Sequence, residues 1–377
     1  MDTSWIKVEP HGLTLRPETV TAADLPDKWA AIDPVRAVDT ALITHGHADH
    51  ARAGHRHVIA TPETLAIMAA RYGVNFAEKK TPLSYGQSLN LGSLSVSMAP
   101  AGHVLGSAQI ILEEKETRVI AAGDYKRKAD PTCAAFEVVA CDVFITEATF
   151  GLPVFRHPDP HSEMQRLLAM RALFPERAFV IGAYALGKAQ RVIALLRAAG
   201  WDQTIYLHGA MQPLCALYRD FGVDLGPLSP ATVEERGKPQ DFLKGQFVIA
   251  PPSALGSKWA QRLPDPLVCF ASGWMQVRQR AKQSGVECPL ILSDHADWPD
   301  LLRTVSEINP KEVWVTHGRE DALIHALEAQ GYRARALSLI GYDEAGGDAG
   351  DEAGDEAGDE AGDEAGNEVG GHLGETA

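Results

Sequence analysis

The sequence is poor in cysteine and has no long apolar run. Its five cysteines are odd in number and scattered, and none forms a CxxC pair. This argues against both a disulfide framework and a zinc ribbon. No stretch of eighteen or more apolar residues occurs, and the first residues lack a basic region followed by an apolar stretch. The sequence thus indicates neither a membrane span nor a signal peptide, and we expect a cytoplasmic protein.

Basic residues are absent from the C-terminal segment 343–377, which contains thirteen Asp and Glu in an imperfect DEAG repeat. With almost no large apolar residue, this segment cannot bury enough surface to offset its ordering entropy, so we expect a disordered acidic tail. Without the tail, 37 of the 50 acidic residues remain against all 35 basic residues. The net charge of −15 therefore does not exclude a nucleic-acid ligand.

The rest of the chain is long enough for two domains. Residues 1–151 read as short apolar strands that end in Gly, His or Asp, such as Ala41–Thr44. Residues 152–286 alternate strand and helix, beginning with a strand at Phe179–Ala183, which predicts βαβ units and a parallel sheet. Residues 287–342 return to strand and helix as a second part of the first domain. We infer that 152–286 is a domain inserted into another.

A segment rich in histidine directly follows the strand Ala41–Thr44. It reads HGHADH and places His45, His47, Asp49 and His50 within six residues. Neutral imidazole and carboxylate are the ligands that Zn, Mn or Fe prefer, and alternate positions at a strand end can point into one cavity. The spacing predicts a metal site.

This HxHxDH spacing resembles the metallo-β-lactamase superfamily, in which such a segment supplies ligands to two metal ions. The resemblance extends to His103 in AGH and to Asp124 in AAGD, each after a predicted strand. It implies that His103 is a further ligand and that Asp124 bridges the two metals. Asp39, before the first strand, fits the acidic residue that supports the ligand loop by hydrogen bonds without touching metal.

Three further motifs resemble the β-CASP branch of this superfamily, whose members cleave nucleic acids. They are TEATFG around Glu147, SDHAD around His295 and VTHG around His317. The β-CASP domain lies between the first and second motif, which matches the insertion at 152–286. The resemblance implies an α/β fold, the αββα sandwich of the metallo-β-lactamases with an inserted β-CASP domain that contains a parallel sheet.

The resemblance also implies roles for these residues. One metal would be held by His45, His47 and His103, and the other by Asp49, His50 and His317. Zinc is the expected metal, with Mn or Fe as alternatives. His295 would protonate the leaving oxygen while Glu147 orients it. We count His295, Glu147 and Asp49 as the catalytic residues.

A more detailed likeness is to bacterial exonucleases that are associated with DNA ligase, carried by the segments GAYALGKAQR at 182–191 and ASGWM at 271–275. The first segment reads as a strand, a glycine turn and a basic helix N-terminus, which suits a phosphate. Several basic residues are candidates for binding the phosphate backbone. They are Lys126, Lys188, Arg191, Arg278 and Arg280.

These observations favour a metal-dependent exonuclease that acts on single-stranded DNA in repair, in possible functional association with a DNA ligase. An RNA-processing nuclease of the same fold is the first alternative, because a histidine at the position of His317 is commoner in the RNA enzymes of this branch. A non-catalytic nucleic-acid-binding subunit is the second alternative. Relatives of that kind usually lose several ligands, and none is missing here.

Overall fold

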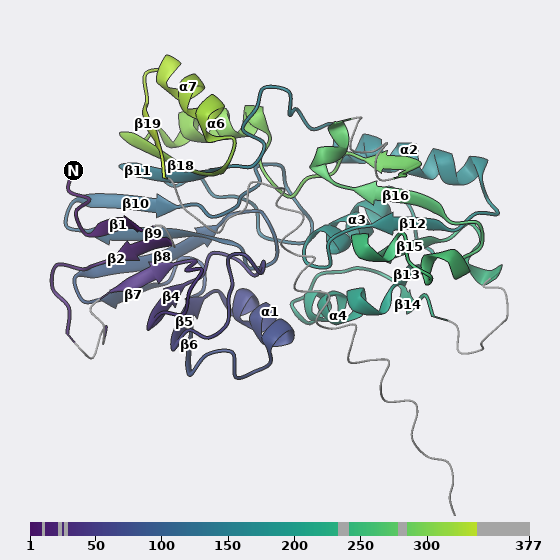
Figure 1. The fold of residues 1–377 in the computed structure, drawn as a ribbon, viewed down its shortest axis with the longest axis horizontal. Coiled ribbons are helices and arrows are strands. Elements are labelled where there is room, and N and C mark those ends of the chain that lie inside the picture. The colour runs from purple at the N-terminus through teal and green to yellow at the C-terminus, as the bar shows by residue number, and fades with distance from the viewer. Residues whose placement is uncertain (10–11, 22–24, 26–28, 233–240, 278–284, 338–377) are drawn as a thin grey trace, which may run out of the picture.

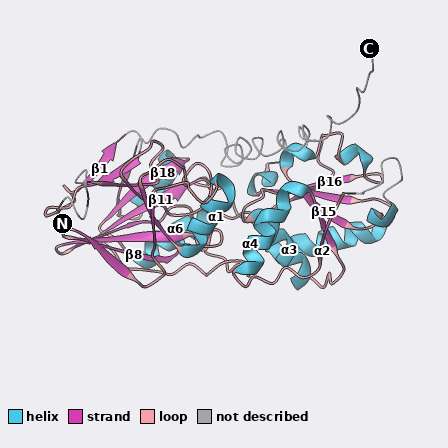
Figure 2. Ribbon diagram, turned by 90° about the horizontal axis from the view of Figure 1, so that it is seen from below, coloured by secondary structure: helices cyan, strands magenta, loops and turns pink. Residues whose placement is uncertain are grey.

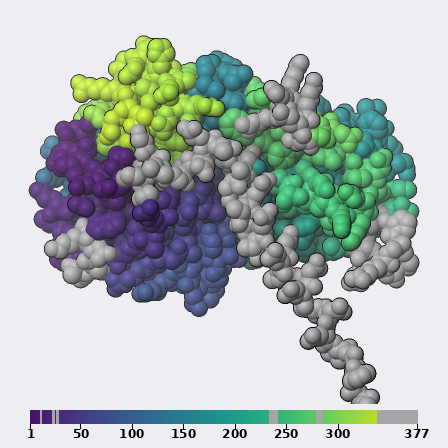
Figure 3. Space-filling view, viewed as in Figure 1, coloured from purple at the N-terminus to yellow at the C-terminus, as the bar shows by residue number. Residues whose placement is uncertain are grey.

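The computed structural model describes residues 1–377 except 10–11, 22–24, 26–28, 233–240, 278–284 and 338–377. The predicted acidic tail therefore lies outside the described residues. The described chain forms three sheets in two lobes that lie side by side (Figure 1). In Figure 3, the N-terminal segment and the segment around 300–337 share one lobe, while the middle of the chain forms the other.

The first domain is a sandwich of two sheets that share a core. One sheet has the order β1(Ile6–Glu9), β2(Gly12–Leu15), β3(Ala30–Ile32), β4(Thr40–Leu42), β5(His57–Ala60), β6(Lys79–Pro82). The other has the order β19(Arg333–Ala336), β18(Glu312–Gly318), β11(Val143–Ala148), β10(Thr117–Ala121), β9(Ala108–Glu114), β8(Leu94–Pro100), β7(Ser88–Leu91). Fully buried apolar side chains from both sheets, such as Leu42, Ile59, Val96, Ile110 and Val119, pack between them.

Helices cover the outer faces of this sandwich. The helix α1(Pro62–Tyr72) packs Met68 against Ile43 and Val58 of the first sheet. On the far side, α6(Trp298–Ile308) and α7(Glu320–Ala329) share a buried cluster with the second sheet. The four layers are helix, sheet, sheet and helix. Figure 2 shows the strands β1, β8, β11 and β18 in the first lobe and the helices α2, α3 and α4 in the other. The predicted αββα fold is confirmed.

The inserted domain contains a six-stranded sheet in which every pair of strands is parallel, as the alternation of strand and helix predicts. Its order is β14(Leu228–Pro230), β13(Ile205–Leu207), β15(Phe247–Ala250), β12(Phe179–Gly182), β16(Leu267–Ala271), β17(Cys288–Leu290). One face is covered by α2(Pro160–Leu173), α3(Lys188–Ala198) and α4(Gln212–Asp220), which bury their apolar sides in one cluster with it.

The last strand of the inserted sheet begins after the boundary that the sequence predicts. β17 pairs with β16, Cys288 opposite Cys269, although it lies beyond residue 286. The chain returns to the first domain only after Leu290, and α6 then begins at Trp298 with Asp297 as its N-cap. Asp297 accepts a hydrogen bond from the backbone N–H of Asp300, and Pro299 occupies the first turn, which is a typical helix start. Because this N-cap lies two residues after His295, it helps to fix that loop.

None of the described helices is both long enough and apolar enough to cross a membrane.

Candidate metal centre

Six strands deliver polar residues, most of them predicted site residues, to one edge of the sandwich. β3 and β4 are parallel, and β10, β11 and β18 are parallel to one another. β8 and β10 both pair antiparallel to β9, so they share a direction. Parallel strands end at the same edge of a sheet, which is where polar residues gather. The residues that come at or just after these strand ends are Asp33, the loop 44–50, His103, Asp124, Glu147 and His317.

Four buried side chains form the first group of possible ligands. One donor atom from each of His45, His47, His103 and Asp124 lies within 4.8 Å of the other three. The Nε2 atom of His45 lies 3.5 Å from Oδ2 of Asp124, and the Nε2 atom of His103 lies 3.8 Å from the same oxygen. The predicted first ligand set therefore comes together in space.

Two of these imidazoles are each oriented by a hydrogen bond from one ring nitrogen to a backbone oxygen. Nδ1 of His103 lies 3.0 Å from the backbone oxygen of Asp294, and Nε2 of His47 lies 3.4 Å from that of Leu186. A carbonyl oxygen accepts only, so each of these nitrogens carries the ring proton. The remaining nitrogens, Nε2 of His103 and Nδ1 of His47, face each other at 3.0 Å with lone pairs that suit a cation.

The second predicted ligand set surrounds His50. Its Nε2 atom lies 3.6 Å from Oδ2 of Asp49 and 3.5 Å from Oδ2 of Asp124. The ring of His317 lies 5.3 Å from the ring of His50, centroid to centroid. His317 has a φ of 59°, a left-handed conformation that is uncommon for residues other than glycine and that tends to occur at functional sites. Asp124 therefore lies between the two sets, where a bridging ligand would be.

Asp33, and not Asp39, supports the ligand loop. Oδ2 of Asp33 accepts hydrogen bonds from Nδ1 of His50 at 2.8 Å and from Oγ1 of Thr44 at 2.5 Å, while Oδ1 accepts from the backbone N–H of Thr44. Asp39 instead accepts from Arg56 at 2.7 Å. The prediction for Asp39 is wrong because Asp39 precedes β4 and lies at the far edge, whereas Asp33 follows the parallel strand β3.

Burial and charge act in opposite directions at this centre. Burial disfavours a charged His50, yet Asp49, Asp124 and Asp33 raise the pKa of its imidazole to about 10. Burial raises the pKa of Asp124 to about 6, although His50 opposes this shift. Burial and the neighbouring His50 hold the pKa of His45 well below its usual value. The carboxylates that favour a proton on His50 would equally favour a dication at its Nε2 atom.

The residues fit a divalent metal ion. The buried Nε2 atom of His45 has no hydrogen-bond partner among the described residues, although it points toward Asp124. A buried polar atom in that state is costly unless a ligand occupies the site. Imidazole nitrogens and a carboxylate, with Asp33 behind His50, are the donors and the outer support that zinc sites use. His45, His47, His103 and Asp124 would hold one ion.

His295 and Glu147 lie against Asp124. Nδ1 of His295 donates to Oε2 of Glu147 at 3.0 Å and lies 4.0 Å from Oδ2 of Asp124. The other oxygen of Glu147, which is fully buried, accepts from the backbone N–H of Tyr125 at 2.7 Å. Burial disfavours a charged His295, but Glu147 and Asp124 more than offset it and raise the pKa of His295 to about 9. The predicted pairing of these two residues is present in the structure.

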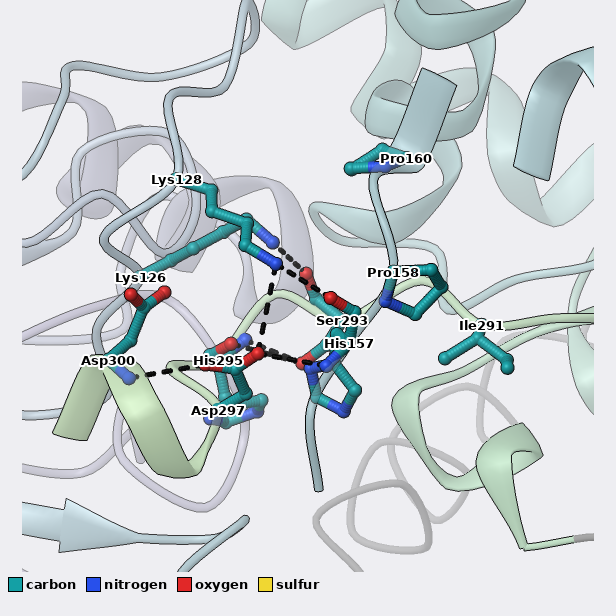
Figure 4. A pocket seen from close by; sticks show the side chains of 10 residues that line it. All are labelled: Lys126, Lys128, His157, Pro158, Pro160, Ile291, Ser293, His295, Asp297 and Asp300. Carbon is teal, nitrogen blue, oxygen red and sulfur yellow. Dashed lines mark hydrogen bonds and ion pairs between the residues drawn. The ribbon is translucent and has the colours of Figure 1, made fainter. Parts of the chain in front are cut away.

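A small pocket opens beside His295 at the junction of the two domains. Its lining includes Lys126, Lys128, His157 and Asp297. Figure 4 shows these side chains grouped around the loop that carries His295. Lys128 donates to the backbone oxygen of His157 at 2.9 Å, and the backbone N–H of His157 donates to Asp297 at 2.8 Å. The pocket therefore combines cationic side chains with a hydrogen-bonded frame.

Three of the predicted phosphate-binding residues have buried side chains. Lys188 and Arg191 form ion pairs with Asp294 at 3.2 and 2.8 Å, and both are buried. Lys126 is also buried and donates to the backbone oxygen of Ser293. The phosphate-binding prediction for Lys188 and Arg191 is wrong in this structure, because buried carboxylates already engage their side chains. Lys126 lines the pocket beside His295, so its role as a phosphate contact stays a prediction. Arg278 and Arg280 lie outside the described residues.

Two family profiles match the chain. Residues 17–181 match the family described as "Beta-lactamase superfamily domain", and residues 286–335 match "Zn-dependent metallo-hydrolase RNA specificity domain". The first match contains the strands that carry all but one of the possible ligands, and the second contains His295 and His317. The chain belongs to the metallo-β-lactamase superfamily, in its β-CASP branch. The family and the donor set agree on a divalent metal ion.

Known proteins with similar sequences include enzymes of both DNA and RNA. The chain is 27% identical over 299 residues to a "Probable DNA ligase" from Opitutus terrae, a match that covers 78% of this chain and 28% of the ligase. It is 27% identical over 281 residues to "Ribonuclease TTHA0252" from Thermus thermophilus, covering 64% of this chain and 62% of that protein. The chain thus spans less than two thirds of either relative.

A solved structure shares the fold alone. A protein of unknown function from Enterococcus faecalis V583 superimposes with a TM-score of 0.53 at 14% sequence identity, and the match covers 78% of each chain.

The position of Asp33 generates a prediction with a matched control. Asp33→Asn leaves one acceptor oxygen where two are used, so His50 loses its fixed orientation. We expect metal affinity to fall by about 10–100-fold, the usual effect of removing such an outer partner. Asp39→Asn should leave affinity unchanged. Competition with a chromophoric chelator measures both, and equal affinities for the two variants would contradict the assignment.

The position of Asp124 generates a second prediction. Because Asp124 lies between the two ligand sets, Asp124→Ala should remove activity and most metal from both positions. His317→Ala, which touches one predicted set, should keep about one metal per chain by the same reasoning. Elemental analysis of the purified variants checks this. An Asp124→Ala protein that retains two metals would show that the carboxylate is not shared.

Proposed function

We propose that this chain is a two-metal phosphodiesterase that hydrolyses nucleic acid. The observation that carries the proposal is the His295–Glu147 pair beside Asp124, within the same buried cluster as the possible metal ligands. An orienting carboxylate, an imidazole and a metal centre in one cleft are the groups that phosphodiester hydrolysis needs. The relatives named above include a ribonuclease, which supports a nuclease activity.

The proposed chemistry divides between the metals and the protein. Two zinc ions would lower the pKa of a water molecule and neutralise charge on the phosphoryl oxygens. His295 would donate a proton to the leaving sugar oxygen. Glu147 accepts a hydrogen bond from Nδ1 of His295 and favours the charged ring, which carries a proton on both nitrogens. The proton on Nε2 is then the one that is donated. Tyr125, through its backbone N–H, holds Glu147 in turn.

We propose single-stranded DNA as the substrate and an exonuclease as the activity, with a role in repair alongside a ligase. The similarity to the DNA ligase of Opitutus terrae extends over 78% of this chain, which supports this choice. RNA processing is the second candidate, and two observations favour it. The segment 286–335 matches an RNA specificity domain, and His317 stands at the end of β18 beside His50.

Cleavage of end-labelled substrates separates these candidates. The purified chain with zinc should degrade single-stranded DNA from one end and release mononucleotides, and RNA of the same sequence should be degraded more slowly. Substrates labelled at the 5′ or the 3′ end report the polarity. Faster cleavage of RNA would make the second candidate the function, and no cleavage of either polymer would refute a nuclease.

The role of His295 predicts a defect that depends on the leaving group. His295→Ala should keep both metals, because the imidazole is not in either predicted ligand set, yet lose about 10²–10⁴ in rate on nucleic acid. A nitrophenyl phosphodiester expels a stabilised anion that needs no proton, so the variant should cleave it almost as well as the parent does. Glu147→Gln should show the same pattern more weakly.

Metal content and the cleavage rates of both substrates are measured on the same preparations. Equal damage on the two substrates, or loss of metal, would mean that His295 is a ligand or a structural residue.

A further inference from the structure

One turn of the inserted domain reaches the metal centre of the other domain. The turn between β12 and α3, residues 183–187, follows a strand that is buried at every position, and α3 begins at Lys188. The backbone oxygen of Leu186 in this turn lies 3.4 Å from Nε2 of His47. A predicted metal ligand of the first domain is therefore oriented by the backbone of the second.

The first turn of α3 makes a second connection through buried charges. Arg191 uses Nη1 to donate to Oδ1 of Asp294 at 2.8 Å and to the backbone oxygen of Ser293. Its Nε atom donates to Asp130. Lys188 pairs with Oδ2 of Asp294 at 3.2 Å. All of these side chains are almost completely buried, so Arg191 joins two carboxylates of the first domain to a helix of the inserted domain.

Asp294 links these ion pairs to the metal centre. Its backbone oxygen accepts from Nδ1 of His103 at 3.0 Å, and the next residue is His295. The side chain of Asp294 is held by two cations, which together keep the pKa of its carboxyl below its usual range in spite of burial. These contacts hold the side chain of the residue whose carbonyl orients His103. The inserted domain thus orients His103 through Asp294 and His47 through Leu186.

We propose that the N-terminal turn of α3, with Lys188 and Arg191, is a positioning element for the metal site formed by His45, His47 and His103. This inference rests on the proposed metal centre. The side chains of Lys188 and Arg191 fix Asp294, whose carbonyl orients His103. The carbonyl of Leu186, in the turn just before α3, orients His47, so metal affinity at this site depends on the docking of the inserted domain. In the second ligand set, His50 is oriented by Asp33 from within the first domain.

Arg191→Met tests the proposal, with Arg197→Met as its matched control. Arg197 lies on the same helix, but within the described part of the chain its guanidinium donates to carbonyl groups of the inserted domain, those of Trp201, Gln203, Leu225 and Pro227. Each variant loses one partly or fully buried arginine, and only Arg191→Met loses the link to Asp294. Zinc binding is followed by competition with a chromophoric chelator, and thermal unfolding of the metal-free proteins reports general stability.

We expect Arg191→Met to weaken one of the two zinc-binding steps by about 10–100-fold and to leave the other unchanged. Cobalt bound at the weakened site should have an altered visible spectrum, because its ligands are less well oriented. Arg197→Met should lower the unfolding temperature without changing either binding step. Lys188→Met, which keeps the bonds of Arg191 to Asp294, should weaken the same step less, and it serves as the test if Arg191→Met fails to fold.

Unchanged zinc affinity at both steps in folded Arg191→Met and Lys188→Met would overturn the proposal while leaving the proposed function intact. A general loss of zinc affinity that Arg197→Met shares would also overturn it, because stability alone would then explain the effect. A parent chain that binds no zinc would refute the proposed metal centre itself.

Discussion

A buried carboxylate surrounded by imidazoles is the constraint on which this site depends. Oδ2 of Asp124 lies 3.5 Å from His45 and from His50, 3.8 Å from His103 and 4.0 Å from His295. Water is largely excluded, so these groups must balance one another's charge or share a cation. The parallel strands bring them to one edge, and the two sheets, packed through an apolar core, hold that edge in place.

Four histidines of the site each have their own hydrogen-bond acceptor. Asp33 orients His50, Leu186 orients His47, Asp294 orients His103 and Glu147 orients His295. In each case a ring nitrogen donates to an oxygen, which fixes the orientation of the ring and of its other nitrogen. Two of these four oxygens belong to backbone carbonyls, which no substitution of a side chain at the same position removes. Removing one partner of the buried ion pairs behind them typically destabilises a protein by about 3–5 kcal/mol.

The sequence was informative where a residue's role follows from local spacing and less so where it follows from topology. The HxHxDH segment and the apolar strand before it predicted a metal site, and the structure places three of its four donors in buried positions. Asp39 was predicted because it lies just before the first strand, yet strand direction brings Asp33, at the end of the parallel strand β3, to the site. Lys188 and Arg191 look like exposed cations at a helix start. Their partners, Asp130 and Asp294, lie 61 and 103 residues from Arg191, so no local pattern could reveal that these cations are buried.

The order of the strands also affects how the chain folds during synthesis. β11 lies between β10 and β18 in the sheet, but the entire inserted domain separates β11 from β18 in the chain. During synthesis, β11 therefore has an unpaired edge until β18 emerges, and such edges are prone to wrong pairing. His317, on β18, arrives with it. A chain arrested before that point has neither a closed sheet nor His317, so the proposed metal centre is complete only when synthesis has passed the last strands of the fold.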